Sequence, residues 1–135
     1  ARETGSPEYL AQAKHIARFL MNHPNMPADK SRIGISMLLI SRMHRAMPLL
    51  RYHGFGLIEL SQLDKSDEAK SYLDFAEQQV RSLSSPEYLA EKGTNCNFVL
   101  KHSTGHLPGN SEVDVPLSYA DYYYVEALMR LKKLI

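Results

Sequence analysis

Apolar residues recur at helical spacing near the start of the chain, over about residues 7–22. The segment opens with Ser6-Pro7-Glu8, which supplies a capping residue, a proline at the first helical position and an acid in the first turn. His23-Pro24-Asn25 is expected to end this helix. The residues on its apolar face, which are expected to point inward, are Tyr9, Leu10, Ala13, Ile16, Ala17 and Leu20.

The same spacing predicts three further helices, over about residues 56–63, over 67–83, and from Pro116 or Ser118 to Leu134. No segment alternates apolar and polar residues for longer than residues 98–100, so the chain is expected to be all-α. The residues expected to point inward from the helix over 67–83 are Tyr72, Leu73, Ala76, Val80 and Leu83.

A long connection, residues 84–116, precedes the last predicted helix and is rich in Ser, Gly, Pro and Asn. Loops of this length without structure of their own are uncommon and are often functional. We therefore expect a binding surface in this 84–116 connection.

The composition narrows the class of protein. A chain of 135 residues with 44% hydrophobic and 23% charged residues is typical of one globular domain. The formal net charge of +1 argues against a nucleic-acid partner or an anionic membrane surface, and no stretch approaches the ~18 apolar residues of a membrane span. Cys96 is the only cysteine, which excludes an intrachain disulfide and disfavours a cysteine-based zinc site.

The start of the chain lacks an initiator Met and a signal peptide and begins in mid-pattern, so a fragment is expected. Because a fragment can lack its targeting signal, both the cytoplasm and the periplasm of a bacterium remain open as the compartment.

The strongest candidate for chemistry is the segment 102–124, which holds two histidines, three carboxylates and four tyrosines. Such side chains suit sugar rings, which offer both hydroxyls and apolar C–H patches. On a helix, Tyr119, Tyr122 and Tyr123 share one side, and Asp121 lies off that line.

Plainer interpretations stand beside this one. The tyrosines also fit core packing, and Asp114 also fits a helix cap. His102 and His106 have the spacing of helical metal ligands, but Gly105 and Pro108 argue against a helix there, so no metal site is expected. The two acids on otherwise apolar helices, Glu59 and Glu126, are expected to be solvated or ion-paired and not catalytic.

Residues 110–134 resemble the C-terminal end of the unsaturated glucuronyl hydrolases (glycoside hydrolase family 88), above all in Glu-Val-Asp-Val-Pro-Leu-Ser-Tyr-Ala-Asp-Tyr-Tyr-Tyr. The stretch His-Ser-Thr-Gly-His-Leu-Pro at 102–108 is similar to the segment that precedes this end in the family. Further similar stretches are residues 2–5, 9–10, 22–25 and 82–89.

Residues 31–55 depart from the family pattern. Reading the codons of this segment out of register permits Tyr-Trp-Asp-Phe-Asp-Ala-Pro followed by Arg-Asp-Ala-Ser, as the family has there. We therefore interpret residues 31–55 as a frameshifted translation of an ordinary family segment. The alternative is a genuine divergent insert whose apolar residues 35–40 pack as a helix. An in-frame source gene without compensating insertions and deletions would exclude the frameshift.

The resemblance implies an (α/α)6 toroid, of which residues 1–135 would supply about the last two helical hairpins. It also implies a hydrolase that acts on unsaturated uronic acid at the non-reducing end of lyase-generated oligosaccharides. The reaction would begin with hydration of the C4=C5 double bond, with an aspartate as general acid and base and with no metal or cofactor. The family's catalytic aspartates lie upstream of the matched region, so no residue of this chain is assigned a catalytic role.

By position, the resemblance implies residues that line or brace the mouth of the cleft, near a carboxylate or sulfate of the substrate: His102, His106, Asn110, Ser111, Glu112, Asp114 and Tyr119. The expected partner is an unsaturated oligosaccharide. The chain alone is expected to be inactive and to associate with itself, because an incomplete toroid leaves apolar helix faces uncovered.

Two other interpretations remain open. One is the related unsaturated rhamnogalacturonyl hydrolases, which share the toroid and the hydration chemistry. The other is a non-catalytic helical-repeat binding module, which predicts a monomeric chain that unfolds cooperatively by itself.

Overall fold

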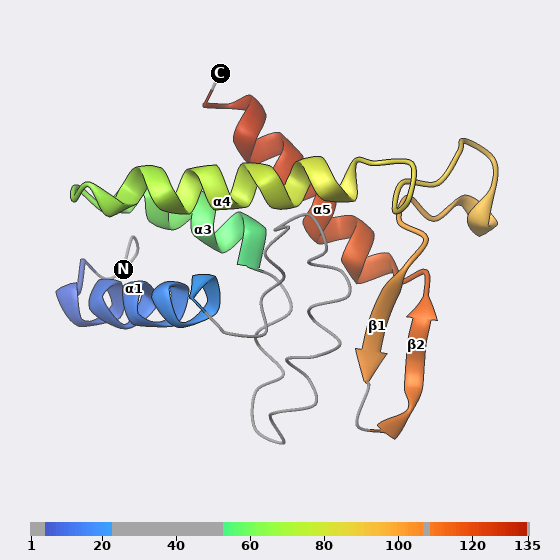
Figure 1. Cartoon of the computed structure of the whole chain (residues 1–135), viewed down its shortest axis with the longest axis horizontal. Helices are drawn as coiled ribbons and strands as arrows, with labels where there is room; N and C mark the ends of the chain where they lie inside the picture. The colour runs from blue at the N-terminus through green and yellow to red at the C-terminus, as the bar shows by residue number, and fades with distance from the viewer. Residues whose placement is uncertain (1–4, 23–52, 107–108, 135) are drawn as a thin grey trace.

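The computed structural model describes residues 5–22, 53–106 and 109–134 (Figure 1). Most of the segment interpreted as frameshifted lies outside the described residues. The elements, in chain order, are the helices α1 (Pro7–Met21), α3 (His53–Leu63) and α4 (Glu68–Leu83), the short 3-10 helix η2 (Asn95–Asn97), the strands β1 (Ser103–His106) and β2 (Ser111–Val115), and the helix α5 (Ser118–Lys132).

The four predicted helices are confirmed, and their bounds follow local signals. α1 begins at Pro7, after Ser6 in an extended conformation, and ends one residue before the predicted boundary. α5 begins at Ser118, so of the two predicted starts the later one is correct. α3 begins at His53, three residues before the predicted Gly56.

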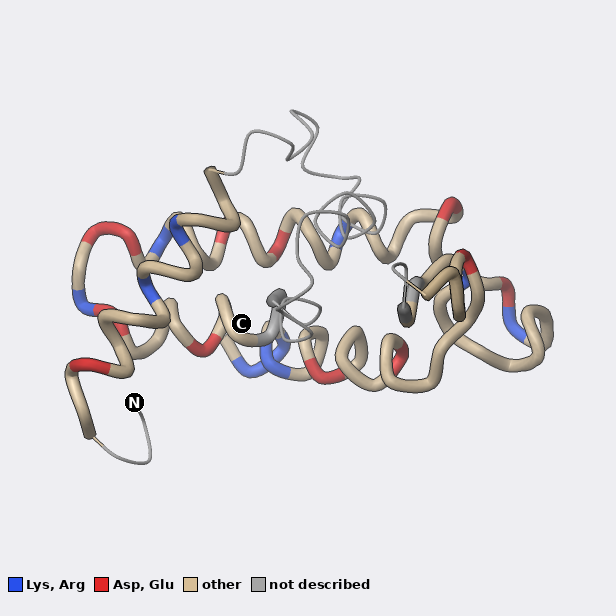
Figure 2. Tube along the Cα trace, turned by 90° about the horizontal axis from the view of Figure 1, so that it is seen from below, with Lys and Arg blue, Asp and Glu red and all other residues tan. Residues whose placement is uncertain are grey.

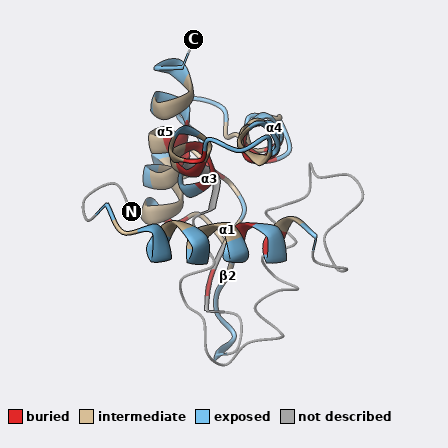
Figure 3. Ribbon diagram, turned by 90° about the vertical axis from the view of Figure 1, so that its left-hand side faces the viewer, coloured by how far each residue is buried: buried red, intermediate tan, exposed pale blue. Residues whose placement is uncertain are grey.

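α3 lies at the centre of the molecule. α4 and α5 pack against it and α1 also contacts it, and Figure 3 shows the buried residues gathered around α3. Its residues Leu57, Ile58 and Leu60 are buried, and Ile58 is completely inaccessible. A helix that is apolar on several sides suits such a position. Burying each of these side chains contributes about 1.5–3 kcal/mol to the free energy of unfolding.

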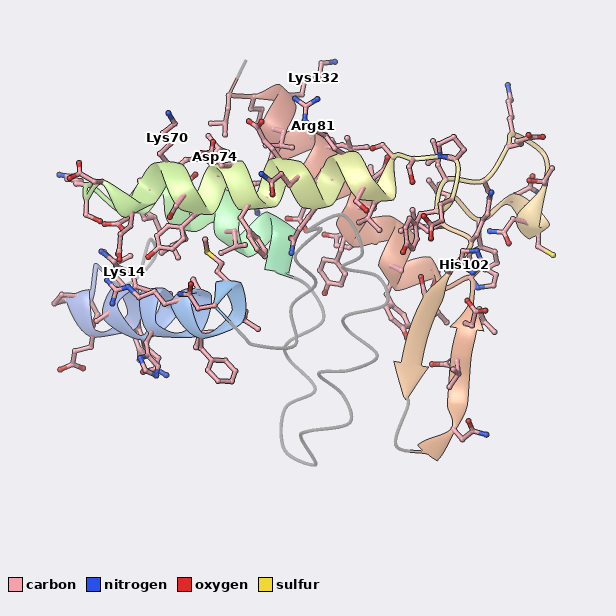
Figure 4. All side chains as sticks on the ribbon, in the orientation of Figure 1. Lys14, Lys70, Asp74, Arg81, His102 and Lys132 are labelled. Atoms are coloured by element: carbon pink, nitrogen blue, oxygen red, sulfur yellow. The ribbon has the colours of Figure 1, made fainter. Side chains whose placement is uncertain are left out.

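The predicted inward face of α4 is confirmed. Tyr72, Ala76 and Val80 are buried, and Leu73 and Leu83 are partly buried against the same core. Phe75 is buried as well. α4 therefore buries a broad apolar face, and Figure 4 shows Lys70, Asp74 and Arg81 on its outer side.

The predicted inward face of α1 is only partly correct. Ala17 and Leu20 are buried, and Leu10 and Ala13 are partly buried against the core. Tyr9 and Ile16, however, are 60% and 39% exposed, so the prediction that they point inward is wrong. Among the described elements α1 packs mainly against α3, and it buries only a narrow strip of its surface there.

Charged groups fasten α1 to the turn between α3 and α4 and to the first residue of α4. The Lys14 ammonium donates to Asp64, with an Nζ–Oδ1 distance of 3.0 Å. Arg18 donates to Glu68 through Nε (2.8 Å) and Nη2 (2.6 Å), which is the bidentate arrangement of strong ion pairs. Figure 2 shows acidic and basic segments close together where α1 meets this turn. Ionic contacts thus supplement the narrow apolar contact of α1.

These contacts lower the pKa of both carboxyl groups. The hydrogen bond from Lys14, followed by those from Ser66, lowers the pKa of Asp64 to about 2. The hydrogen bond from Arg18, with further ones from Tyr72 and Lys14, lowers the pKa of Glu68 to about 2. Both groups are therefore ionised at neutral pH, and their charge holds α1 in place.

The 84–116 connection is not the unstructured loop that its composition indicates. It contains η2, an antiparallel bridge between Leu89 and Leu100, and an antiparallel hairpin of β1 and β2. The all-α class thus holds for the body of the molecule but not for this connection. Its strands have four and five residues. β2 alternates polar and apolar residues over 112–115, so a short strand signal is present there, and the all-α prediction overlooked it.

Candidate functional site

The candidate site is the hairpin, residues 103–115, together with the first turn of α5 (Figure 1). In the hairpin, Ser103 pairs with Val115, Thr104 with Val113 and His106 with Ser111. The register shifts between Ser103 and Thr104, where Asp114 is the extra residue of a β-bulge. Bulges redirect side chains and are frequent beside functional sites.

Asp114 is directed toward His102, which lies just before β1. The His102 Nδ1 and the Asp114 Oδ1 are 2.7 Å apart. Both side chains are exposed, and the ring of Tyr88 meets the imidazole edge to face at a centroid distance of 6.2 Å. Figure 4 shows His102 near the base of the hairpin. Because both side chains of this pair are exposed, the imidazole remains accessible to a ligand.

A second pair of polar groups crosses β1 at Gly105. The Tyr119 hydroxyl on α5 donates to the Glu112 Oε2 on β2, at 3.3 Å. A β-carbon on Gly105 would clash with the Glu112 Oε2, and would lie 2.7 Å from the Glu112 Cβ and 2.8 Å from the Tyr119 hydroxyl oxygen. Glycine is thus required at residue 105, because the acid and the phenol occupy the space of a side chain.

The second strand and the residue before it carry backbone strain. Asn110, Glu112 and Asp114 have φ values of 49°, 53° and 56°, in the left-handed region that non-glycine residues rarely adopt. Such conformations cost of order 1–3 kcal/mol each and cluster at functional sites. Here they accompany the placement of Glu112 over Gly105 and of Asp114 beside His102.

Asp121 is the residue of this site that the sequence analysis missed. Its carboxylate accepts the backbone N–H of Val99 through Oδ2 (2.8 Å) and of Leu100 through Oδ1 (2.9 Å). Tyr119 belongs to a tyrosine pattern that is visible in the sequence. The targets of Asp121 are backbone groups, which leave no such pattern. The available signal was an acid in the first turn of a helix that follows a folded connection.

The structure brings together some of the predicted residues. His102 meets Asp114, and Glu112 meets Tyr119. Asp114 lies in β2, so its alternative interpretation as a helix cap is wrong. The other predicted residues lie at the far end of the hairpin: Asn110 and Ser111 are exposed, and His106 pairs with Ser111 through the backbone, its side chain being outside the described part.

The tyrosines divide between the surface and the core. Tyr124 is buried, and its hydroxyl lies 2.8 Å from the Ser84 hydroxyl. Tyr122 is 63% exposed and contacts Tyr123 edge to face, with a centroid distance of 5.1 Å. The core-packing interpretation therefore holds for Tyr124 and not for Tyr122.

Arg130 joins the two acids that were expected to be solvated or ion-paired. It donates to Glu59 at 2.6 Å and to Glu126 at 2.8 Å, which links α5 to α3. The hydrogen bond to Glu126, followed by that to Glu59, raises the pKa of Arg130 above its ordinary value. Ion pairing of both acids is confirmed, and both take part in the contact between α5 and α3.

The described residues include no group of three or more His, Cys, Asp or Glu side chains placed to hold a metal ion. His102 and His106 lie beside and within a strand, so they do not share a helix face. None of the helices in the described ranges combines the length and the apolar character needed to cross a bilayer.

No protein-family model matches the chain. An unsaturated glucuronyl hydrolase of Formosa agariphila is 39% identical over 135 residues, which cover 99% of this chain and 33% of that protein. The crystal structure of an unsaturated glucuronyl hydrolase specific for heparin matches with a TM-score of 0.79 and 38% identity, over 98% of this chain and 36% of the other. This chain is related to the unsaturated glucuronyl hydrolases.

The glucuronyl hydrolase resemblance seen in the sequence is thereby confirmed. The match in three dimensions makes the four helices part of an (α/α)6 toroid. The chain spans about a third of the length of each glucuronyl hydrolase that it matches.

Proposed function

We propose that this chain is the C-terminal part of a glycoside hydrolase that removes unsaturated uronic acid from the non-reducing end of lyase-generated oligosaccharides. The observation that carries the proposal is the agreement of sequence and fold with glucuronyl hydrolases over almost the whole chain. The proposed reaction is hydration of the C4=C5 double bond, which gives an unstable product that opens and releases the next sugar.

The hairpin and the first turn of α5 would form one wall of the mouth of the cleft. Glu112 and Asp114 present carboxylate oxygens that accept hydrogen bonds from sugar hydroxyls. The exposed imidazole of His102 would lie near a carboxylate or sulfate of the substrate. The relative whose crystal structure matches is specific for heparin. Exposed Asn110 and Ser111, together with His106, would extend this wall along the hairpin.

The catalytic acid is proposed to lie in the part of the toroid that this chain lacks. General acid–base catalysis of the hydration requires a carboxylate within hydrogen-bonding reach of both the alkene and a water molecule. Glu59 and Glu126 are bound by Arg130, and Asp64 and Glu68 by cations of α1, so these four acids serve the fold. We expect the 135-residue chain alone to be inactive.

The test is an assay of the parent gene product and, separately, of the 135-residue chain. Loss of alkene absorbance would be followed with unsaturated disaccharides from chondroitin, heparin and rhamnogalacturonan. We expect turnover of a glycosaminoglycan disaccharide by the parent protein and none by the chain. Preference for the rhamnogalacturonan product would instead favour the unsaturated rhamnogalacturonyl hydrolases, and a parent protein that cleaves none of the three would overturn the proposal.

A non-catalytic helical-repeat module would show a different result. The chain alone would then be monomeric, would unfold cooperatively, and would bind saccharide without consuming the alkene. Sedimentation, thermal unfolding and the alkene assay on one preparation separate this function from the proposed hydrolase.

A further inference from the structure

Asp121 connects the first turn of α5 to a dipeptide that lies 21 and 22 residues earlier in the chain. Each oxygen of its carboxylate accepts one backbone N–H, from Val99 at 2.8 Å and from Leu100 at 2.9 Å. Hydrogen bonds to an ionised acceptor are roughly twice as strong as those between neutral groups. A single side chain thus holds two consecutive peptide groups.

The remaining backbone groups of this dipeptide are also paired. The Val99 carbonyl accepts the N–H of Ala90, and the Leu100 carbonyl accepts the Asn95 side-chain amide at 3.0 Å. The Leu100 side chain is buried, with 3% of its surface exposed. Val99 and Leu100 therefore form a fixed point, with Asp121 satisfying both of their donors.

This fixed point lies directly before the proposed saccharide-facing residues. His102 follows Leu100 by two residues, and Gly105 lies in β1 immediately beyond it. The same turn of α5 carries Tyr119, whose hydroxyl reaches Glu112 above Gly105. The first turn of α5 thus contacts the connection before β1 through Asp121 and the hairpin itself through Tyr119.

We propose that Asp121 is a positioning residue, which sets the place of His102 and Gly105 relative to α5 and so shapes the saccharide-facing wall. This inference rests on the proposed function. A carboxylate is required because both targets are donors. An asparagine has one acceptor oxygen, and its NH₂ group would face a backbone N–H, so one hydrogen bond is lost and two donors oppose each other.

The test compares Asp121→Asn with Asp74→Asn in the parent gene product. Asp74 lies on the exposed outer side of α4 and serves as the matched control (Figure 4). Hydrogen exchange would be followed by mass spectrometry on peptides spanning residues 95–105, and KM and kcat would be measured with an unsaturated disaccharide. Thermal unfolding would show whether each variant is folded.

For Asp121→Asn we expect exchange at Val99 and Leu100 to accelerate about tenfold or more, because a buried donor loses its acceptor. We also expect KM to rise about tenfold while kcat changes less than about twofold, since the catalytic acid lies elsewhere. Asp121→Glu retains both acceptor oxygens and should show a smaller rise in KM. Asp74→Asn should change neither quantity.

Four results would overturn the inference. Unchanged exchange at residues 99–100 in Asp121→Asn would show that the anchor is absent. Accelerated exchange with an unchanged KM would show that the anchor serves folding alone. The same conclusion would follow if Asp121→Asn misfolds, loses kcat and stability together, and is not improved upon by Asp121→Glu. A wild-type parent protein without turnover would overturn the proposed function and the positioning role together, while the exchange result would still decide whether the anchor exists.

Discussion

The geometry of the hairpin depends on Gly105, a residue without a side chain. At Gly105 the acid of β2 and the phenol of α5 come so close to the backbone of β1 that there is no room for a β-carbon. The neighbouring Glu112 also has a positive φ. Strain and close approach therefore coincide at one point of the hairpin, beside the residues proposed to face the substrate.

Substitution of Gly105 by alanine should destabilise the protein by about 1–3 kcal/mol, because the new methyl group must displace the Glu112 Cβ, which can move only with the backbone. Urea unfolding measures the difference. Gly56→Ala is the matched control: a β-carbon there meets nothing within 4 Å, so alanine in α3 should stabilise by up to about 1 kcal/mol. Equal effects at the two glycines would contradict the proposed clash.

Among the helices, α1 depends most on electrostatics. Only Ala17 and Leu20 are buried within it, whereas α3 and α4 bury broad apolar faces. Its cations reach Asp64 and Glu68, which lie 50 residues away along the chain from Lys14 and Arg18. The docking of this helix should therefore respond to pH, unlike the α3–α4 core.

We expect α1 to detach as the pH falls from about 4 to about 2. The pKa of Asp64 and of Glu68 is about 2 in the folded protein, below the values of about 3.9 and 4.3 in an unfolded chain. A lowered pKa contributes stability above the unfolded value, and this stability is lost as the pH falls through the folded value. Amide protection factors in α1, compared with those in α4 at pH 5 and at pH 2.5, measure the loss.

The double variant Asp64→Asn, Glu68→Gln provides the control. It should reduce protection in α1 already at pH 5 and should flatten the dependence between pH 5 and pH 2.5. If protection in α1 of the unmodified chain does not change relative to α4 over this range, apolar packing and not charge holds the helix.

At the scale of the whole molecule, α5 and α1 each expose several apolar residues. On α5 the exposed apolar residues include Tyr122, Val125 and Met129, at spacings of three and four residues along one face. On α1 they include Tyr9 and Phe19. The chain spans about a third of the length of the relatives, and we expect further hairpins of a complete toroid to pack on both faces.

The 135-residue chain should therefore associate with itself through α5. Replacing Tyr122, Val125 and Met129 together by glutamine should lower the associated fraction in sedimentation velocity, because it removes exposed apolar surface. A triple glutamine variant of Lys70, Asp74 and Arg81, on the outer side of α4, should not (Figure 4). A monomeric unmodified chain would contradict this prediction and would favour the independent binding module.

Much of the fold was predictable because its signals are local. Proline at the start of α1, helical spacing in α4, and an acid in the first turn of α5 each act within a few residues. The failures arose where a distant contact decides the outcome. Tyr9 lies on the predicted apolar face of α1, but its burial depends on whether another element packs there.

The candidate site was predictable as a region but not as a geometry. The residue types between positions 102 and 124 indicated a polar binding surface, and His102, Glu112, Asp114 and Tyr119 do form two contacting pairs there. Their pairing depends on the register of a hairpin with a bulge, which the four alternating residues 112–115 do not specify. The role of Asp121 could not be predicted, because its partners are backbone N–H groups, which every sequence contains.

The sequence by itself determined the helices, the family resemblance and the segment in which to look for the site, because helix capping, spacing and motif similarity are properties of neighbouring residues. Only the tertiary structure decided that the 84–116 connection is folded, that Gly105 has no room for a side chain, and that Asp121 holds Val99 and Leu100. Each of these depends on groups that are close in space and far apart in sequence, and their pairing is settled when the chain buries its core.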